Sequence, residues 1–92
     1  MTSSRLPSWP WSHYTAAETY LARTRAAKRR CLRELSGMSS RRFAEVHQFP
    51  RTALMRWERG AKPRQPEQIL RYAGLLWALE RSHAQESDRG AA

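Results

Sequence analysis

A short basic segment carries the side chains best suited to chemistry in this chain. Residues 48–60, "QFPRTALMRWERG", contain three Arg, one Trp and a closing Gly. Pro50 suits the first turn of a helix, because the N–H that proline lacks would be unsatisfied there anyway. Gly60 suits the end of that helix. An Arg guanidinium presents five donors in a planar fork, which matches phosphate and other paired acceptors. The segment therefore predicts a short helix with a cationic surface.

Basic charge is concentrated in the middle of the chain. The 92 residues carry a net charge of +9, with a pI near 11.3. Residues 1–22 sum to zero, residues 23–64 hold thirteen Lys and Arg against three Glu, and residues 65–92 sum to −1. Such a block favours a polyanionic partner, most often nucleic acid. Because fifteen of the seventeen basic residues are Arg, the bias of a GC-rich genome is the alternative, but it would not leave both ends neutral.

Length and composition indicate one small domain with a modest core. Hydrophobic residues make up 40% of the chain. A mean hydropathy of −0.81 and the lack of a long apolar run argue against a membrane span. The start "MTSSRLPSWPW" has no apolar region typical of a secretory signal. The one cysteine, Cys31, can form no internal disulfide. We expect a cytoplasmic protein.

The residues that enzymes use are sparse here. The three His have no paired acid or nucleophile at a useful spacing, and no Gly-rich phosphate loop is present. Cys/His spacings typical of a metal site are also missing. We expect no enzymatic activity, no metal, no cofactor and no small-molecule ligand.

Periodicity predicts an all-α chain that opens with a long helix. Thr15 and Glu18 form a capping box, and the helix would run to about Leu35 before Gly37 stops it. The face expected in the core consists of Ala17, Tyr20, Leu21, Thr24, Ala27, Cys31, Leu32 and Leu35. The face expected in solvent consists of Arg23, Arg29, Arg30 and Arg33.

Two short helices and a last longer one follow. Ser39 or Ser40 can cap a helix through Val46, and a break near Gln48 separates it from the helix that Pro50 opens. The stretch "AKPRQ" predicts a turn, and residues 66–82 predict the last helix.

The elements suggest three parts of the chain. We expect an irregular arm over 1–14, one helical domain over 15–82 and a flexible, disordered tail over 83–92. Trp9 and Trp11 lie in the arm. Either the arm folds back over the small core, which we favour, or it stacks on a partner.

Two short helices joined by a tight turn, the second of them basic, form a helix-turn-helix. Residues 32–60, "LRELSGMSSRRFAEVHQFPRTALMRWERG", resemble the Cro/C1-repressor (XRE) type of DNA-binding domain. The matching positions are Leu32, Arg33, Gly37, Met38, Ser39, Phe43, Ala44, Trp57, Glu58, Arg59 and Gly60. With "KPRQPEQILRYAGLL", similar to the family's final helix, the resemblance covers about residues 28–79. It implies a lambda-repressor-like bundle of four to five helices.

Three positions depart from the family's pattern. Gln48 stands where the family usually has Gly, so the turn needs either a left-handed residue here or another geometry. His47 replaces the usual Leu, and we expect a half-buried core histidine rather than a pH-sensitive or ligand-binding group. Ser40 replaces a frequent Gln and has a shorter reach toward a phosphate.

The resemblance implies a division of side chains between core and DNA. The residues expected in the core are Phe43, Ala44, Phe49, Leu54, Trp57 and Glu58, with Glu58 bonded to Arg33. The residues expected to contact bases in the major groove are Arg51, Thr52, Met55 and Arg56. The residues expected to contact phosphates are Ser39, Ser40, Arg41, Arg42, Arg59 and Lys62.

The last helix carries two apolar stripes. The stripe that suits the core consists of Ile69, Leu70, Ala73, Leu76 and Trp77. A second stripe, Tyr72, Leu75 and Leu79, predicts a homodimer interface, with packing against the N-terminal arm as the alternative.

These expectations combine into a functional hypothesis. The resemblance implies a sequence-specific double-stranded DNA-binding regulator, most simply a plasmid- or phage-type repressor that binds a palindromic operator as a homodimer. A DNA-binding antitoxin stays open, since such proteins use the same domain. A basic helical module that binds RNA or protein also stays open.

Overall fold

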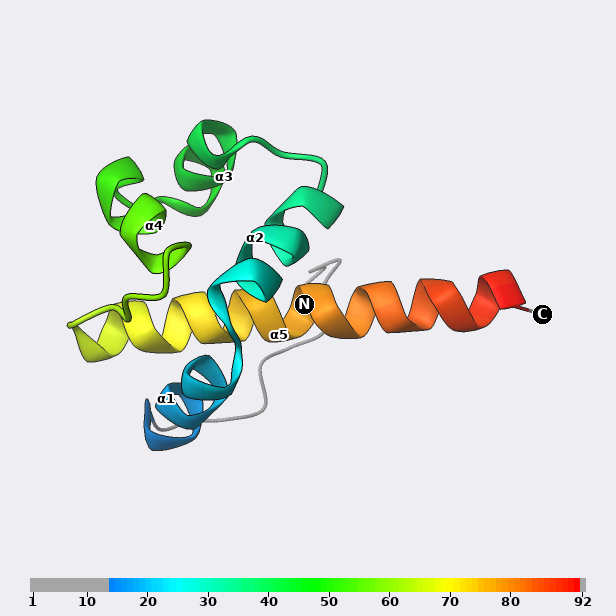
Figure 1. Cartoon of the computed structure of the whole chain (residues 1–92), viewed down its shortest axis with the longest axis horizontal. Helices are drawn as coiled ribbons and strands as arrows, with labels where there is room; N and C mark the ends of the chain where they lie inside the picture. Colours follow the sequence, from blue (N-terminus) through cyan, green and yellow to red (C-terminus); the bar gives the residue numbers. More distant parts are fainter. Residues whose placement is uncertain (1–13, 92) are drawn as a thin grey trace, which may run out of the picture.

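The computed structural model describes residues 14–91, and each element in that range is an α-helix. The helices are α1 (Tyr14–Arg23), α2 (Ala26–Leu35), α3 (Ser40–His47), α4 (Arg51–Trp57) and α5 (Pro66–Ala91). Helix α5 runs along the long axis, with α1 on one side of it and α2, α3 and α4 on the other (Figure 1). The expected all-α bundle is confirmed. Residues 1–13, with Trp9 and Trp11, lie outside the described residues.

The single long helix expected over residues 15–35 is wrong, because the chain breaks after Arg23. The Thr24 hydroxyl donates to the carbonyl of Tyr20 at 2.7 Å and closes the last turn of α1. Arg25 is extended, with φ −66° and ψ 160°, and α2 starts at Ala26. A threonine that bonds the preceding turn competes with helix continuation, and hydrophobic periodicity does not register it.

The expected capping box is not formed. Thr15 lies inside α1, which begins at Tyr14. The Glu18 carboxylate instead accepts a hydrogen bond from Lys62 Nζ at 2.9 Å, which ties α1 to the segment after α4.

The break also changes which face of α2 is buried. Ala27, Cys31 and Leu35, expected in the core, are exposed, and Cys31 is a free thiol on the surface. Arg29, expected in solvent, is buried. Arg33 is also largely covered, with 13% of its side chain exposed. The pattern failed here because a buried Arg satisfied by carbonyl and carboxylate oxygens has no hydrophobic signature.

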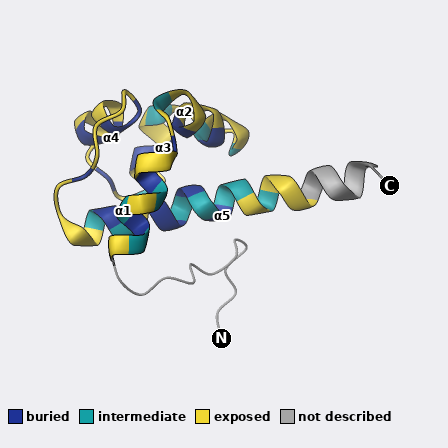
Figure 2. Cartoon of the chain, turned by 60° about the horizontal axis from the view of Figure 1, so that its bottom comes forward, coloured by how far each residue is buried: buried dark blue, intermediate teal, exposed yellow. Residues whose placement is uncertain are grey.

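Helix α5 contributes several residues to the core along one side. Its buried residues lie in the half that the other helices surround (Figure 2). Tyr72 is 1% exposed, and its ring centroid lies 4.9 Å from that of Trp57 and 5.9 Å from that of Phe49. The placement of Tyr72 at a dimer interface is therefore wrong, since it belongs to the core. Leu75 and Leu79 are partly buried and pack against that core.

The last helix is longer than expected. Helix α5 starts at Pro66, as expected, and continues to Ala91, past the expected end at residue 82. No helix in the described range is long and apolar enough to cross a bilayer.

Candidate nucleic-acid interface

Helix α3 begins with a side-chain cap. Ser39 is extended, with φ −69° and ψ 166°, and its Oγ accepts a hydrogen bond from the Arg42 N–H at 3.1 Å. This confirms the expected cap and places Ser40 at the first helical position. Arg41 and Arg42 are exposed and lie 3.7 and 3.8 Å from the Glu45 carboxylate, in pairs too open to water to hold either guanidinium firmly. The start of α3 thus presents hydroxyls and cations at the positive end of the helix dipole.

The turn between α3 and α4 uses a left-handed residue. Gln48 has φ 60° and ψ 46°, which confirms that this position adopts the geometry usually given to glycine. The next N–H, from Phe49, donates to the Ala44 carbonyl at 2.9 Å, and the Phe49 side chain is buried. Arg71 of α5 donates to the His47 carbonyl and lies 4.7 Å over the Phe49 ring. Arg71 of α5 therefore holds the turn in place through these two contacts.

His47 is a half-buried part of this turn, as expected. Its ring centroid lies 4.6 Å from that of Phe43. Desolvation lowers the pKa of His47 below its usual value, and the positive charge of Arg71 lowers it further. The imidazole is consequently neutral at neutral pH, which suits packing on an aromatic ring.

Helix α4 has one face in the core. Pro50 is extended just before the helix and Arg51 is its first residue, so the proline precedes the first turn instead of lying in it. Ala53, Leu54 and Trp57 are buried. All six residues expected in the core are buried: Phe43, Ala44, Phe49, Leu54, Trp57 and Glu58.

Glu58, which follows α4, is held by α2. Its Oε2 accepts from Arg33 Nε at 2.6 Å, which confirms the expected pair. Arg33 also donates to the Met38 carbonyl at 3.0 Å, and Arg30 donates to the Glu58 carbonyl at 3.2 Å. The negative charge of Glu58 is thus directed into the protein, where it does not oppose an anion outside.

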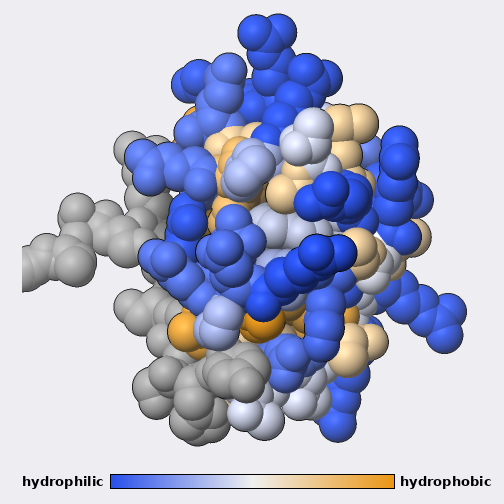
Figure 3. Space-filling model, turned by 90° about the vertical axis from the view of Figure 1, so that its left-hand side faces the viewer, coloured by the Kyte–Doolittle hydropathy of each residue, from blue (hydrophilic) through white to orange (hydrophobic). Residues whose placement is uncertain are grey.

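The other face of α4 is open to solvent. The four residues expected to contact bases, Arg51, Thr52, Met55 and Arg56, are all exposed. They occupy positions i, i+1, i+4 and i+5, which share one side of a helix. Within the described part of the chain, the guanidinium of neither Arg51 nor Arg56 has an ion-pair or hydrogen-bond partner. Hydrophilic side chains cover most of the end of the molecule where α4 and the start of α5 lie (Figure 3).

A shallow hollow of about 180 Å³ brings several candidates together. Its lining comes from α2, α3, α4 and the residues after α4: Arg30, Ser40, Met55, Glu58 and Arg59. Ser40 and Arg59, expected on phosphates, therefore line the same hollow as Met55, expected on a base. Arg30 is an addition that the sequence missed, because its position depends on the break before α2. Lys62 lies apart from this hollow and pairs with Glu18 of α1.

Comparison with protein-family models, curated proteins and solved structures finds no significant match to this chain.

Proposed function

We propose that this chain is a sequence-specific double-stranded DNA-binding regulator that places α4 in the major groove. One observation carries the proposal. The core fixes α4 through Leu54 and Trp57, while its opposite side presents four exposed side chains, two of them Arg without an acidic partner. A helix whose buried face fixes its position and whose exposed face carries unpaired hydrogen-bond donors suits the DNA major groove, where base edges display acceptors.

The exposed side chains match the chemistry of base edges. The major groove admits an α-helix, and an Arg can donate to O6 and N7 of one guanine. Arg51 stands at the start of α4, the end that enters the groove in helix-turn-helix proteins. Met55 and the methyl of Thr52 can contact a thymine methyl. Each site would then contain at least one G·C pair bonded by Arg51 or Arg56.

The residues beside α4 suit the DNA backbone. Ser39, Ser40, Arg41 and Arg42 lie at the start of α3, where the helix dipole favours an anion. Arg59 lies just beyond the other end of α4. Contacts of this kind orient a protein on a duplex and supply affinity without sequence information.

We further propose that two copies bind together, as a repressor on a palindromic site. One helix contacts only a few base pairs, and a symmetric pair doubles the site. With Tyr72 in the core, Leu75 and Leu79 are the members of the second stripe that keep some exposure. Helix α5 also projects beyond the other helices (Figure 2), which offers length for contact with a second copy.

The phosphate contacts can be tested by the dependence of affinity on salt. Arg42→Ala removes one exposed cation from the start of α3, so the slope of log affinity against log salt should fall by about one. Affinity for selected and random duplex DNA should fall alike. Arg81→Ala is the control, because Arg81 stacks on Trp77 of α5, on another part of the molecule.

Competition between nucleic acids tests the class of partner. A duplex DNA competitor should displace a labelled duplex far better than single-stranded RNA of the same length. Preference for the RNA, or an unchanged salt slope in Arg42→Ala, would contradict the proposal.

A further inference from the structure

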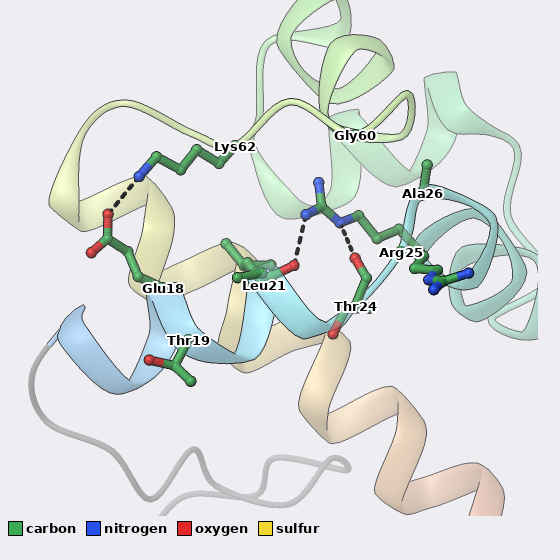
Figure 4. Close-up of a pocket in the computed structure, with 10 residues that line it drawn as sticks. Glu18, Thr19, Leu21, Thr24, Arg25, Ala26, Gly60 and Lys62 are labelled. Atoms are coloured by element: carbon green, nitrogen blue, oxygen red, sulfur yellow. Dashed lines mark hydrogen bonds and ion pairs between the residues drawn. The ribbon is translucent and has the colours of Figure 1, made fainter.

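Arg29 is a buried arginine that bonds no carboxylate among the residues that the structure describes. The residue is 4% exposed, and its guanidinium donates to four backbone carbonyls. Nε bonds the Thr24 carbonyl at 2.9 Å and Nη2 bonds the Leu21 carbonyl at 2.9 Å, both at the end of α1. Figure 4 shows these two bonds as dashed lines. Nη1 bonds the carbonyl of Trp57, the last residue of α4, and the carbonyl of Ala61 in the segment after α4, both at 2.7 Å.

The carbonyls that surround Arg29 take the place of an acid. The last carbonyls of a helix have no partner within it and carry the negative end of its dipole. Burial lowers the pKa of the Arg29 guanidinium, while the neighbouring Tyr72 acts in the opposite direction. An Arg starts so far above neutral pH that it stays protonated. The positive charge therefore joins two helix ends that would otherwise repel each other.

Three arginines of α2 hold the end of α4, and Arg29 differs from the other two. Arg30 and Arg33 bond only the Glu58 carbonyl and carboxylate in this segment. Arg29 bonds Trp57 and Ala61 on either side of Glu58, and it also bonds α1. Arg29 thereby fixes the position of the end of α4 relative to the end of α1.

We propose that Arg29 is a positioning residue for DNA recognition, which fixes the orientation of α4 relative to the rest of the protein. The inference rests on the proposed function of α4. Because α4 has seven residues, it is only about 10 Å long, and a shift at its last residues swings Arg51 at its start. A Lys cannot replace this role, since one compact ammonium cannot reach carbonyls on both helices.

The surroundings of Arg29 offer a matched control. An open hollow of about 480 Å³ lies beside it, between α1, the start of α2 and the segment after α4 (Figure 4). Arg25 lines the same hollow but is exposed, and its side chain forms no capping hydrogen bond. Arg25→Lys therefore makes the same Arg-to-Lys substitution beside the same hollow without removing the hydrogen bonds between helices.

The experiment compares Arg29→Lys with Arg25→Lys. Affinity for a selected duplex and for a random duplex is measured well below the unfolding temperature of each variant. Arg29→Lys should lower the ratio of the two affinities about tenfold or more, the value of one misplaced bidentate contact. Its random-duplex affinity and salt slope should not change, because the charge is kept. Arg25→Lys should resemble the wild type. A folded Arg29→Lys protein with a full ratio would reduce Arg29 to a structural role and overturn the proposal.

A second measurement uses the wild-type chain without DNA, so it depends neither on a variant's folding nor on the proposed function. Four hydrogen bonds should hold the Arg29 guanidinium still, and its Nη protons should give separate, slowly exchanging NMR signals. One averaged signal would show that Arg29 does not hold α1 and α4 together, and it would overturn the proposal regardless of the DNA-binding result. If instead the signals are separate but the wild type prefers no duplex sequence, the proposed function of α4 fails, and positioning of DNA recognition fails with it.

Discussion

At the scale of single residues, burial separates the arginines of this chain into two kinds. Arg29 and Arg33 are turned inward and use their donors on carbonyl and carboxylate oxygens. Arg51 and Arg56 are exposed on α4. The same side chain thus builds the scaffold in α2 and is left available for a ligand in α4.

Arg51 should specify one base pair in each half-site. Arg51→Ala should relax selectivity at that position by about 1–3 kcal/mol, because a bidentate contact to guanine is lost. Binding to random DNA should weaken only slightly. The measurement is the relative affinity for duplexes that carry each of the four base pairs at every position. Arg23→Ala, an exposed change at the end of α1, is the control. Equal weakening at all positions would instead make Arg51 a phosphate contact.

Tyr72 carries a buried hydroxyl that finds no hydrogen-bond partner among the described residues. Burial raises the pKa of this phenol, so it stays neutral. Tyr72→Phe removes the unsatisfied group without opening a cavity. The free energy of unfolding in urea should stay the same or rise by up to about 1 kcal/mol. A loss of more than about 1 kcal/mol would show that the hydroxyl is hydrogen-bonded in solution.

At the scale of elements, the division of α4 into two faces is the feature on which the function depends. Trp57 is 3% exposed, and its ring lies 5.3 Å from Phe49 in an edge-to-face arrangement. The helix is short, so its place in the bundle comes from this packing and from α2 more than from its own propensity.

Trp57→Ala should unfold a large share of the molecules. Loss of this ring should lower the free energy of unfolding by about 3–5 kcal/mol, because the cavity cannot close fully. Met55→Ala on the opposite face should change it by no more than about 0.5 kcal/mol. Both values come from urea titrations followed by circular dichroism. If Trp57→Ala unfolds like the wild type but loses DNA, the assignment of the two faces is reversed.

The elements also show where sequence reasoning succeeds and where it stops. Local signals were sufficient for α3 and α4, since a Ser cap, a proline and a glycine mark their ends. The pair of Arg33 and Glu58 was also expected and is present. Periodicity does not predict the break between α1 and α2, or the exposed side of α2, because the break depends on a local hydrogen bond from the Thr24 hydroxyl to the Tyr20 carbonyl and on the hydrogen bonds of Arg29 to distant backbone such as Trp57. Such long-range bonds leave no periodic trace.

The same limit explains the error in α5. Tyr72, Leu75 and Leu79 form a stripe in the sequence, but Tyr72 fills the space beside Phe49 and Trp57. A stripe shows which residues share a side of a helix. It does not show how far neighbouring helices wrap around that side.

At the scale of the whole molecule, one small bundle combines a packed core with a basic stretch of chain. The principal extents are 41 × 28 × 28 Å, and α5 lies along the longest of them (Figure 1). Residues 23–64, which hold α2, α3 and α4, carry thirteen Lys and Arg against three Glu, so they account for all of the net charge of +9. A polyanion would therefore be attracted to the part of the molecule that presents α4.

Sequence-specific binding by α4 can be tested by selection of bound duplexes from a random pool by the purified wild-type chain. Recognition by α4 in a symmetric dimer should enrich one motif with at least one G·C pair in each half, arranged as an inverted repeat with half-sites about one helical turn apart. An enriched motif without two-fold symmetry would contradict the proposed dimer but would still agree with base recognition by α4. A folded protein that enriches no sequence at all would contradict sequence-specific DNA binding by α4.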